Sequence, residues 1–425
     1  MAAGQARPRE RAFAGAWLLS GAMVASGALA YAFQVLAARR LGADAFGKIA
    51  VLWAAMFLVA IVIYRPLEQT ASRALAERLA RGEEVGSVTR SLLLIWGVLL
   101  AVVGIGAAAA WKPLADRLFL GDDLMTAMLV AGILGYGVSY VSRGLCAGVR
   151  WFQGCGVNLL VDGGVRLLLA APLVVVASEA TAGAAVAAAG LAGALVPLWL
   201  GRRHLRVLSG GGTGAPFRLR GAVAFAGPAS VVAASEQVLV NGGPLLVVLA
   251  GGGRATGAAG VVFAATMLVR VPVYVFQGLA SSLLPNLTRL HTVAGEGEFR
   301  RALRRALTVL GAAGALITAA AALLGPLGMR VVFGAGFEAG RGELTLLGFG
   351  VGCYLAAATC SQALLALDRG GRAAGAWAAS AAVFVAAYAL VGGQPLFRVS
   401  AAFALASTVN VALLGLALVR ARVAR

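Results

Sequence analysis

The sequence predicts an all-α polytopic membrane protein, with about 12 transmembrane helices in two same-orientation six-helix lobes. The first observation is composition: 60% of the 425 residues are hydrophobic and only 12% are charged. Soluble domains are about half apolar and a quarter charged. Twelve spans of about 20 residues need roughly 240 apolar-dominated positions, which is close to the hydrophobic share of this chain. Little chain remains for a separate soluble domain.

Apolar runs separated by Gly, Pro or charged residues mark the expected helices. The first six are expected at 14–38, 46–64, 88–111, 124–142, 157–177 and 180–200. The second six are expected at 222–249, 258–283, 306–327, 343–367, 374–392 and 399–419. The first run follows Arg7, Arg9 and Arg11, as in a signal peptide, but its length of about 25 residues favours a spanning helix.

The second observation is the distribution of positive charge. The net charge is +19, and twelve spans would place 25 Lys and Arg residues on the side that holds both termini and 9 on the other. Positive residues concentrate on the cytoplasmic side of membrane proteins. We therefore expect a multi-pass protein of the bacterial plasma membrane with both termini in the cytoplasm. No dense basic block is present, so nucleic acid is not an expected partner.

The third observation is an internal repeat at half the chain length. Val35-Leu36-Ala37, ten residues before Gly47, recurs as Val248-Leu249-Ala250, ten residues before Gly260. The two copies are separated by 213 positions. The repeat predicts an N-terminal six-helix lobe at 1–200 and a C-terminal six-helix lobe at 222–425. The Gly-rich segment 201–221 is the expected cytoplasmic linker.

Catalytic and metal motifs are absent from the sequence. The four cysteines show no CxxC spacing, and neither a nucleotide-binding loop nor a zinc signature occurs. Asp122-Asp123 could be a metal-binding carboxylate pair, but acidic residues also favour helix starts, which is the interpretation we prefer. The sequence thus predicts neither an enzyme nor a cofactor, and leaves coupling to an ion gradient or membrane potential open.

Polar residues at membrane depth are costly and therefore mark candidate functional positions. In the second half, Glu236 is a candidate for binding a proton, a cation or sugar hydroxyls, or for an ion pair with Arg270. Arg270 is a candidate phosphate ligand, because its guanidinium stays charged and matches phosphate in a bidentate manner. Asn241 is a further candidate glycan contact.

The first half offers Gln34, Asp162 and Arg166. The last two are spaced i,i+4, which favours an ion pair on one helix face, with binding of the substrate phosphate as the alternative. Arg65 and Arg143 are expected at the cytoplasmic entrance, where they could attract an anionic lipid headgroup or simply serve as orientation signals.

Several segments resemble a known family. Leu36–Gly47 (LAARRLGADAFG) resembles a signature near the start of bacterial polysaccharide flippases, members of the multidrug/oligosaccharidyl-lipid/polysaccharide export superfamily. Tyr64–Gln69 with Ser72-Arg73 looks like the end of their second helix. Arg143–Phe152 (RGLCAGVRWF) is similar to their fourth-loop pattern, and Val271–Ala280 (VPVYVFQGLA) to their eighth helix.

The resemblance implies a V-shaped central cavity between the lobes and alternating access. Members of that family move lipid-linked oligosaccharide or polysaccharide repeat units, carried on undecaprenyl (pyro)phosphate, to the outer leaflet. The expected partners are such a lipid-linked glycan, membrane lipids and the glycan-polymerising machinery. A cation-coupled multidrug exporter, with Glu236 as the coupling carboxylate, and a lipid II flippase are the alternatives within the superfamily. A membrane glycosyltransferase or polymerase is the alternative outside it.

Overall fold

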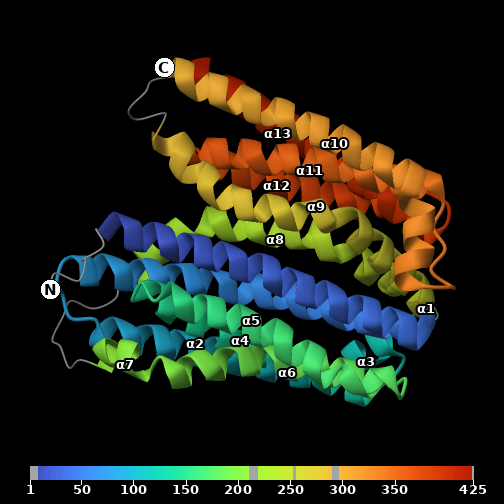
Figure 1. Cartoon of the computed structure of the whole chain (residues 1–425), viewed down its shortest axis with the longest axis horizontal. Helices are drawn as coiled ribbons and strands as arrows, with labels where there is room; N and C mark the ends of the chain where they lie inside the picture. The colour runs from blue at the N-terminus through green and yellow to red at the C-terminus, as the bar shows by residue number, and fades with distance from the viewer. Residues whose placement is uncertain (1–7, 210–218, 252–254, 290–295, 424–425) are drawn as a thin grey trace, which may run out of the picture.

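The computed structural model describes residues 8–209, 219–251, 255–289 and 296–423. In these ranges its secondary structure consists of helices connected by short turns and loops (Figure 1). The first half of the described chain, which we call the N-lobe, comprises α1 (Pro8–Ala80), α2 (Gly86–Ala109), α3 (Trp111–Phe119), α4 (Asp123–Gly148), α5 (Phe152–Leu169) and α6 (Glu179–Leu200). The second half, which we call the C-lobe, comprises α8 (Leu219–Gly251), α9 (Thr256–Arg289), α10 (Glu296–Phe333), α11 (Arg341–Ala366), α12 (Gly370–Leu390) and α13 (Pro395–Val423).

Ten of these helices are long and apolar enough to cross a membrane. One of the ten, α1, contains 73 residues and is divided at Gly42, and α9 adds a shorter apolar segment, Thr256–Val271. The start of α1 and the end of α13 lie on the same side of the bundle (Figure 1). The fold class is thereby confirmed as a multi-pass helical membrane protein.

The reversal inside α1 depends on one glycine. Gly42 has φ 75° and ψ 175° in the middle of the helical stretch, a conformation that residues with a Cβ atom avoid. The chain therefore turns back at Gly42, between the two spans expected at 14–38 and 46–64. The second arm continues as a helix to Ala80, well past the apolar segment.

Two further differences from the expectation lie in the first half of the chain. The fifth helix ends at Leu169 rather than at 177, because Pro172 lacks a backbone N–H and lies in the short 3₁₀ helix η1 (Ala171–Val174). The loop after α2 contains the amphipathic helix α3, which buries Leu118 and Phe119. The Asp122 carboxylate accepts a hydrogen bond from Met125 N at 3.0 Å at the start of α4, so the helix-start interpretation is confirmed.

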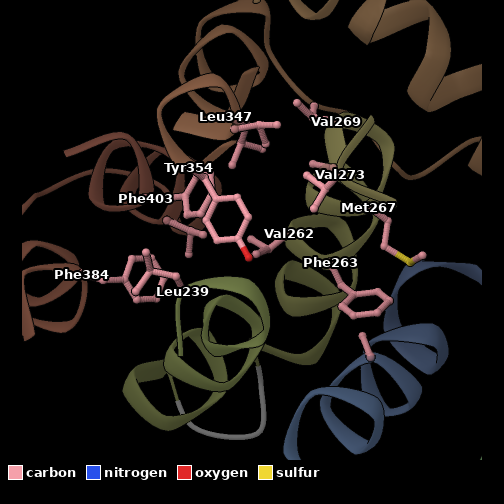
Figure 2. Packing of buried hydrophobic residues seen from close by; sticks show 14 of the residues in the cluster. Leu239, Val262, Phe263, Met267, Val269, Val273, Leu347, Tyr354, Phe384 and Phe403 are labelled. Carbon is pink, nitrogen blue, oxygen red and sulfur yellow. The ribbon is translucent and has the colours of Figure 1, made fainter. Parts of the chain in front are cut away.

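Between the lobes lie the short helices α7 (Arg202–Leu205) and η2 (Arg206–Ser209). They fall in the segment that the sequence assigns to the linker, of which 210–218 lies outside the described residues. In the C-lobe, apolar side chains of α8, α9, α11, α12 and α13 interlock around Tyr354 (Figure 2). This packing holds Tyr354 of α11 against α8 and α9.

The lobes meet at the end of the molecule away from the termini. Phe46 packs against Phe263 and Phe337 of the C-lobe, with ring centroids 6.0 and 5.6 Å apart. Arg39 donates hydrogen bonds to the carbonyls of Val331 and Val332 near the C-terminus of α10. These carbonyls lack intrahelical partners, and the helix dipole places negative charge there. Arg39 therefore connects the lobes through the end of α10.

The repeat-related glycines contact each other at this same end. A Cβ atom added to Gly260 would lie 3.1 Å from both N and Cα of Gly47, a distance tighter than ordinary van der Waals contact. Only residues without a side chain allow two backbones to approach so closely. Gly47 and Gly260, which the 213-residue offset relates in the sequence, thus lie in contact in the fold.

Candidate functional site

Asp162 and Arg166 form a closed polar cluster inside the N-lobe. The guanidinium of Arg166 pairs with Asp162 Oδ2 at 2.6 Å and donates to the Tyr136 hydroxyl at 2.6 Å. That hydroxyl donates to Asp162 Oδ1 at 2.6 Å, and the Trp53 ring lies 4.7 Å from the guanidinium carbon. Arg166 is only 1% exposed. The i,i+4 ion pair that the sequence favours is therefore present, and it neutralises Arg166 within the lobe.

Two of the predicted glycan contacts are also buried away from solvent. Gln34 is completely buried, and neither its amide nitrogen nor its amide oxygen has a hydrogen-bond partner in the described structure. Asn241 donates to Gln237 Oε1 at 2.7 Å, one turn earlier on α8. Neither side chain faces an open surface in this conformation.

Glu236 and Arg270 lie at the same depth in the C-lobe. Glu236 is fifteen residues before the end of α8, and Arg270 is fourteen residues after the start of α9. At a rise of 1.5 Å per residue, both lie about 21 Å along their helices from the end at which α8 and α9 are connected. This is more than half of a bilayer core of about 30 Å, and Glu236 lies in the candidate span Gly227–Gly251 and Arg270 in the apolar segment Thr256–Val271.

Arg270 is held by a backbone carbonyl rather than by a carboxylate. Its Nη1 donates to the carbonyl oxygen of Val240 at 2.6 Å. That carbonyl is free because the residue four positions later, Pro244, has no N–H to complete the helical bond. No ion pair joins Arg270 to Glu236 among the described residues, so the predicted tie between their helices is not formed.

Arg65 approaches this pair from the other lobe. The Glu236 carboxylate lies within electrostatic range of Arg65, and the Tyr354 hydroxyl lies within range of Glu236, Arg270 and Arg65 together. Arg65 follows Gly42 by 23 residues, about 35 Å along α1, so its Cα lies nearer the termini than Glu236 does. We call these four residues, Arg65, Glu236, Arg270 and Tyr354, the central polar site.

Two groups of the central polar site have no partner. Within the described structure, neither Arg65 nor Glu236 takes part in an ion pair or a hydrogen bond, although both are only partly exposed. Arg143, in contrast, forms a bidentate pair with Glu68, at 3.1 Å for each contact, and stacks on Tyr140 at 4.1 Å. The two arginines that the sequence places together at the entrance therefore have different environments.

Sequence reasoning missed Tyr354. A tyrosine in an apolar helix usually belongs to the hydrophobic core. The ring of Tyr354 does pack against Trp377, with ring centroids 5.6 Å apart. Its hydroxyl oxygen is directed towards Val262 of α9 (Figure 2) and makes no hydrogen bond in the described structure. The available signal was its position, thirteen residues into α11 and thus at the depth of Glu236 and Arg270 in neighbouring helices.

Solved structures of transporters share this architecture. The inward-facing conformation of a multidrug resistance MATE family transporter of the MOP superfamily superposes with a TM-score of 0.77 and 15% identity, covering 93% of this chain and 94% of that one. An outward-facing conformation of such a transporter gives 0.68 at 15% identity, covering 96% and 95%. A MOP superfamily transporter from Pyrococcus furiosus, described as having reverse polarity of the binding pocket, gives 0.65 at 14% identity, covering 96% of each. The chain therefore has the MATE transporter fold.

Sequence relatives occur in mycobacteria, although no protein-family model matches the chain. Uncharacterized protein Rv3630 of Mycobacterium tuberculosis is 28% identical over 371 residues, covering 82% of this chain and 80% of the relative. Uncharacterized protein Rv1510 of the same organism is 30% identical over 349 residues, covering 80% and 75%. The chain belongs to the Rv1510 family. The solved structures thus assign the fold of this Rv1510-family chain, and the sequence relatives assign its family.

The central polar site gives this member of the Rv1510 family a defined chemistry. Two guanidinium groups, one from each half of the chain, lie within electrostatic range of the Tyr354 hydroxyl, and that of Arg65 lies within range of the Glu236 carboxylate. Among the described residues, Glu236 and Arg65 form no ion pair or hydrogen bond, whereas Arg270 donates to the Val240 carbonyl. Guanidinium groups bind phosphate and carboxylate oxygens, whereas a lone carboxylate binds a proton, a cation or hydroxyl groups. The arrangement suits a substrate that combines an anionic group with hydroxyl groups.

Proposed function

We propose that this protein is a transporter that flips undecaprenyl-(pyro)phosphate-linked oligosaccharide or polysaccharide repeat units from the cytoplasmic to the outer leaflet by alternating access. The observation that carries the proposal is the pair Arg65 and Arg270. These guanidinium groups come from opposite lobes, and both lie within electrostatic range of the Tyr354 hydroxyl. A charged headgroup cannot cross the bilayer core unaided, and a cationic site between the lobes lowers that barrier.

The contacts between the lobes support alternating access. The lobes are joined at the end away from the termini, through Arg39, Phe46 and the Gly47–Gly260 contact. The similarity in fold is also greater to the inward-facing than to the outward-facing MATE structure. We propose from the positive-inside distribution that the termini lie in the cytoplasm, at the end of the molecule opposite the Gly47–Gly260 contact. A headgroup entering from the cytoplasm would meet Arg65 first and Arg270 deeper in the bundle.

A cation-coupled multidrug exporter is the second candidate. It is favoured by Glu236, a carboxylate at membrane depth with no hydrogen bond or ion pair in the described structure, and by Arg270, whose guanidinium is bound to the Val240 carbonyl. In that case Glu236 would bind the coupling cation or the cationic substrate. The two candidates assign opposite charges to the transported molecule, so substrate charge separates them. A lipid II flippase would share the arginine chemistry and differ in the glycan.

The test is flipping of a fluorescent undecaprenyl-pyrophosphate oligosaccharide in proteoliposomes, with Arg270→Gln as the key variant. Arg398→Gln is a matched control, because Arg398 also donates to a backbone carbonyl, that of Tyr388 at 2.7 Å, but lies outside the central polar site. We expect Arg270→Gln to reduce the flipping rate by about tenfold or more, the loss of one charge-assisted contact of about 1.4 kcal/mol. Arg398→Gln should change the rate less than twofold.

Glu236→Gln completes the comparison. In a flippase this variant should lower glycan flipping only partly, since phosphate recognition rests on the arginines. Proton- or sodium-driven export of an organic cation that requires Glu236, together with absence of flipping of any lipid-linked glycan, would overturn the proposal in favour of the exporter.

A further inference from the structure

The first turns of α10 carry four arginines where the helix enters the membrane. Arg300, Arg301, Arg304 and Arg305 are all exposed, whereas Phe299 and Leu303 are 2% and 3% exposed. The two apolar residues are spaced i,i+4 and fasten one helix face to the C-lobe. The arginines lie on the remaining, exposed part of the helix surface, and Arg300 and Arg304 border the buried face.

A cavity of about 410 Å³ lies against this basic stretch. Its described lining consists of three arginines, two leucines and a glycine: Gly297, Arg300, Arg301, Leu303, Arg304 and Leu307. Arg301 is held by Glu298 at 2.6 Å. Arg300 and Arg304, one turn apart on the same face, have no acidic partner among the described residues. The cavity thus combines two uncompensated guanidinium groups with an apolar edge at Leu307.

One side of the rest of α10 is exposed and apolar, while the other side packs on α11. Only 11% of the residues in the most apolar segment of α10 are buried. Val309, Leu316 and Leu323 are 61%, 71% and 71% exposed. The helix runs along the edge of the C-lobe, with its first turns on the side where the chain termini lie (Figure 1). An amphiphile could therefore place its headgroup in the cavity while its acyl chains follow the exposed apolar side of α10.

We propose that this cavity binds the phosphate of an anionic membrane phospholipid, at a site separate from the central polar site. Arg300 and Arg304 bind the phosphate oxygens, since planar guanidinium groups match them in a bidentate manner. Leu307 and the exposed residues beyond it contact the acyl chains. Clusters of basic residues beside a spanning helix attract anionic lipids, and the cavity adds a defined place for one headgroup.

The experiment measures binding of fluorescent phosphatidylglycerol to the purified full chain in detergent, with phosphatidylcholine as the neutral comparison. The variant is R300Q/R304Q. The matched control is R203Q/R206Q, because Arg203 and Arg206 are also exposed on the side of the termini and lose the same charge, but they line no described cavity. Melting temperature and gel filtration verify that each variant is folded.

We expect R300Q/R304Q to weaken phosphatidylglycerol binding by about tenfold, and R203Q/R206Q by less than about twofold. An equal loss in both variants would overturn the proposal, because general charge attraction would then suffice. Equal binding of phosphatidylcholine, or no loss in R300Q/R304Q, would also overturn it. Displacement of the lipid by inorganic phosphate alone would identify a free-anion site instead, whereas displacement only by unlabelled phosphatidylglycerol supports a phospholipid site.

Discussion

The two lobes bury arginine in opposite ways. In the N-lobe, Arg166 is enclosed by Asp162, Tyr136 and the Trp53 ring, and its charge is neutralised at contact distance. In the C-lobe, Arg270 makes one bond to a backbone carbonyl and keeps its positive charge uncompensated. A buried charge without a counter-ion is unfavourable unless something else stabilises it. The type of partner, rather than the depth of burial, therefore separates a structural arginine from one available to a ligand.

The same contrast occurs in a pair of arginines nearer the termini. Arg143 is held by both carboxylate oxygens of Glu68, whereas Arg65 has no partner in the described structure. Substituting these four arginines one at a time should therefore separate effects on stability from effects on transport. The loss of stability should be largest on substituting Arg166 and should then decrease through Arg143 and Arg270 to Arg65.

Arg166→Met should have the largest effect on stability. It leaves the Asp162 carboxylate buried without a counter-charge, and breaking a buried pair in this way costs about 3–5 kcal/mol. Thermal unfolding in detergent would measure the loss. The double variant Asp162→Asn with Arg166→Met should recover most of it, since no charge then remains. If the double variant is as unstable as the single one, packing rather than charge is responsible.

Arg143→Gln should cost about 1.5–3 kcal/mol of unfolding free energy, the range for a bond to a charged group. The pair with Glu68 is partly exposed, with side chains at 16% and 24%, so its loss is milder than that of the Arg166 pair. The same thermal assay applies, with the exposed Arg341→Gln as a control that should change stability by less than about 0.5 kcal/mol. A loss as small as that of the control would contradict the structural role of Arg143.

Arg270→Gln should lower stability by about 1–2 kcal/mol, because the Val240 carbonyl freed by Pro244 loses its donor. Binding of a lipid-linked pyrophosphate should weaken far more than stability does. Comparing the melting temperature with the affinity for the same preparation makes the distinction. If the variant binds the lipid-linked pyrophosphate normally but has a lowered melting temperature, Arg270 is a structural residue, as Arg166 is.

Arg65→Gln should have the smallest effect on stability, within about 0.5 kcal/mol, since no pairing is lost. Transport should nevertheless decrease, because Arg270 would then be the one guanidinium group left in the central polar site. Arg65→Lys should restore part of the activity by restoring the charge. Destabilisation comparable to that of Arg143→Gln would show that Arg65 has a structural partner in another conformation.

Local pattern predicted much of this molecule. The twelve apolar segments, the Asp162–Arg166 pair and the helix start at Asp122 depend on residues close in sequence, and helical periodicity determines their relation. The central polar site could be predicted only in part. Glu236 and Arg270 are visible as polar groups in apolar helices, but their relation to Arg65 and Tyr354 depends on how separate helices and lobes pack. The bond from Arg270 to Val240 follows from Pro244, yet only tertiary structure determines which donor reaches the free carbonyl.

The meeting of Gly47 and Gly260 has a mechanical consequence. Two backbones in direct contact, at positions related by the repeat, can act as a fulcrum for the two halves. Displacement about a fulcrum grows with distance, and Arg270 lies ten residues beyond Gly260 on the same helix, a lever arm of about 15 Å. Small rotations at the glycines would thus become larger movements at the central polar site. Any side chain at either glycine would force the two backbones apart at this contact.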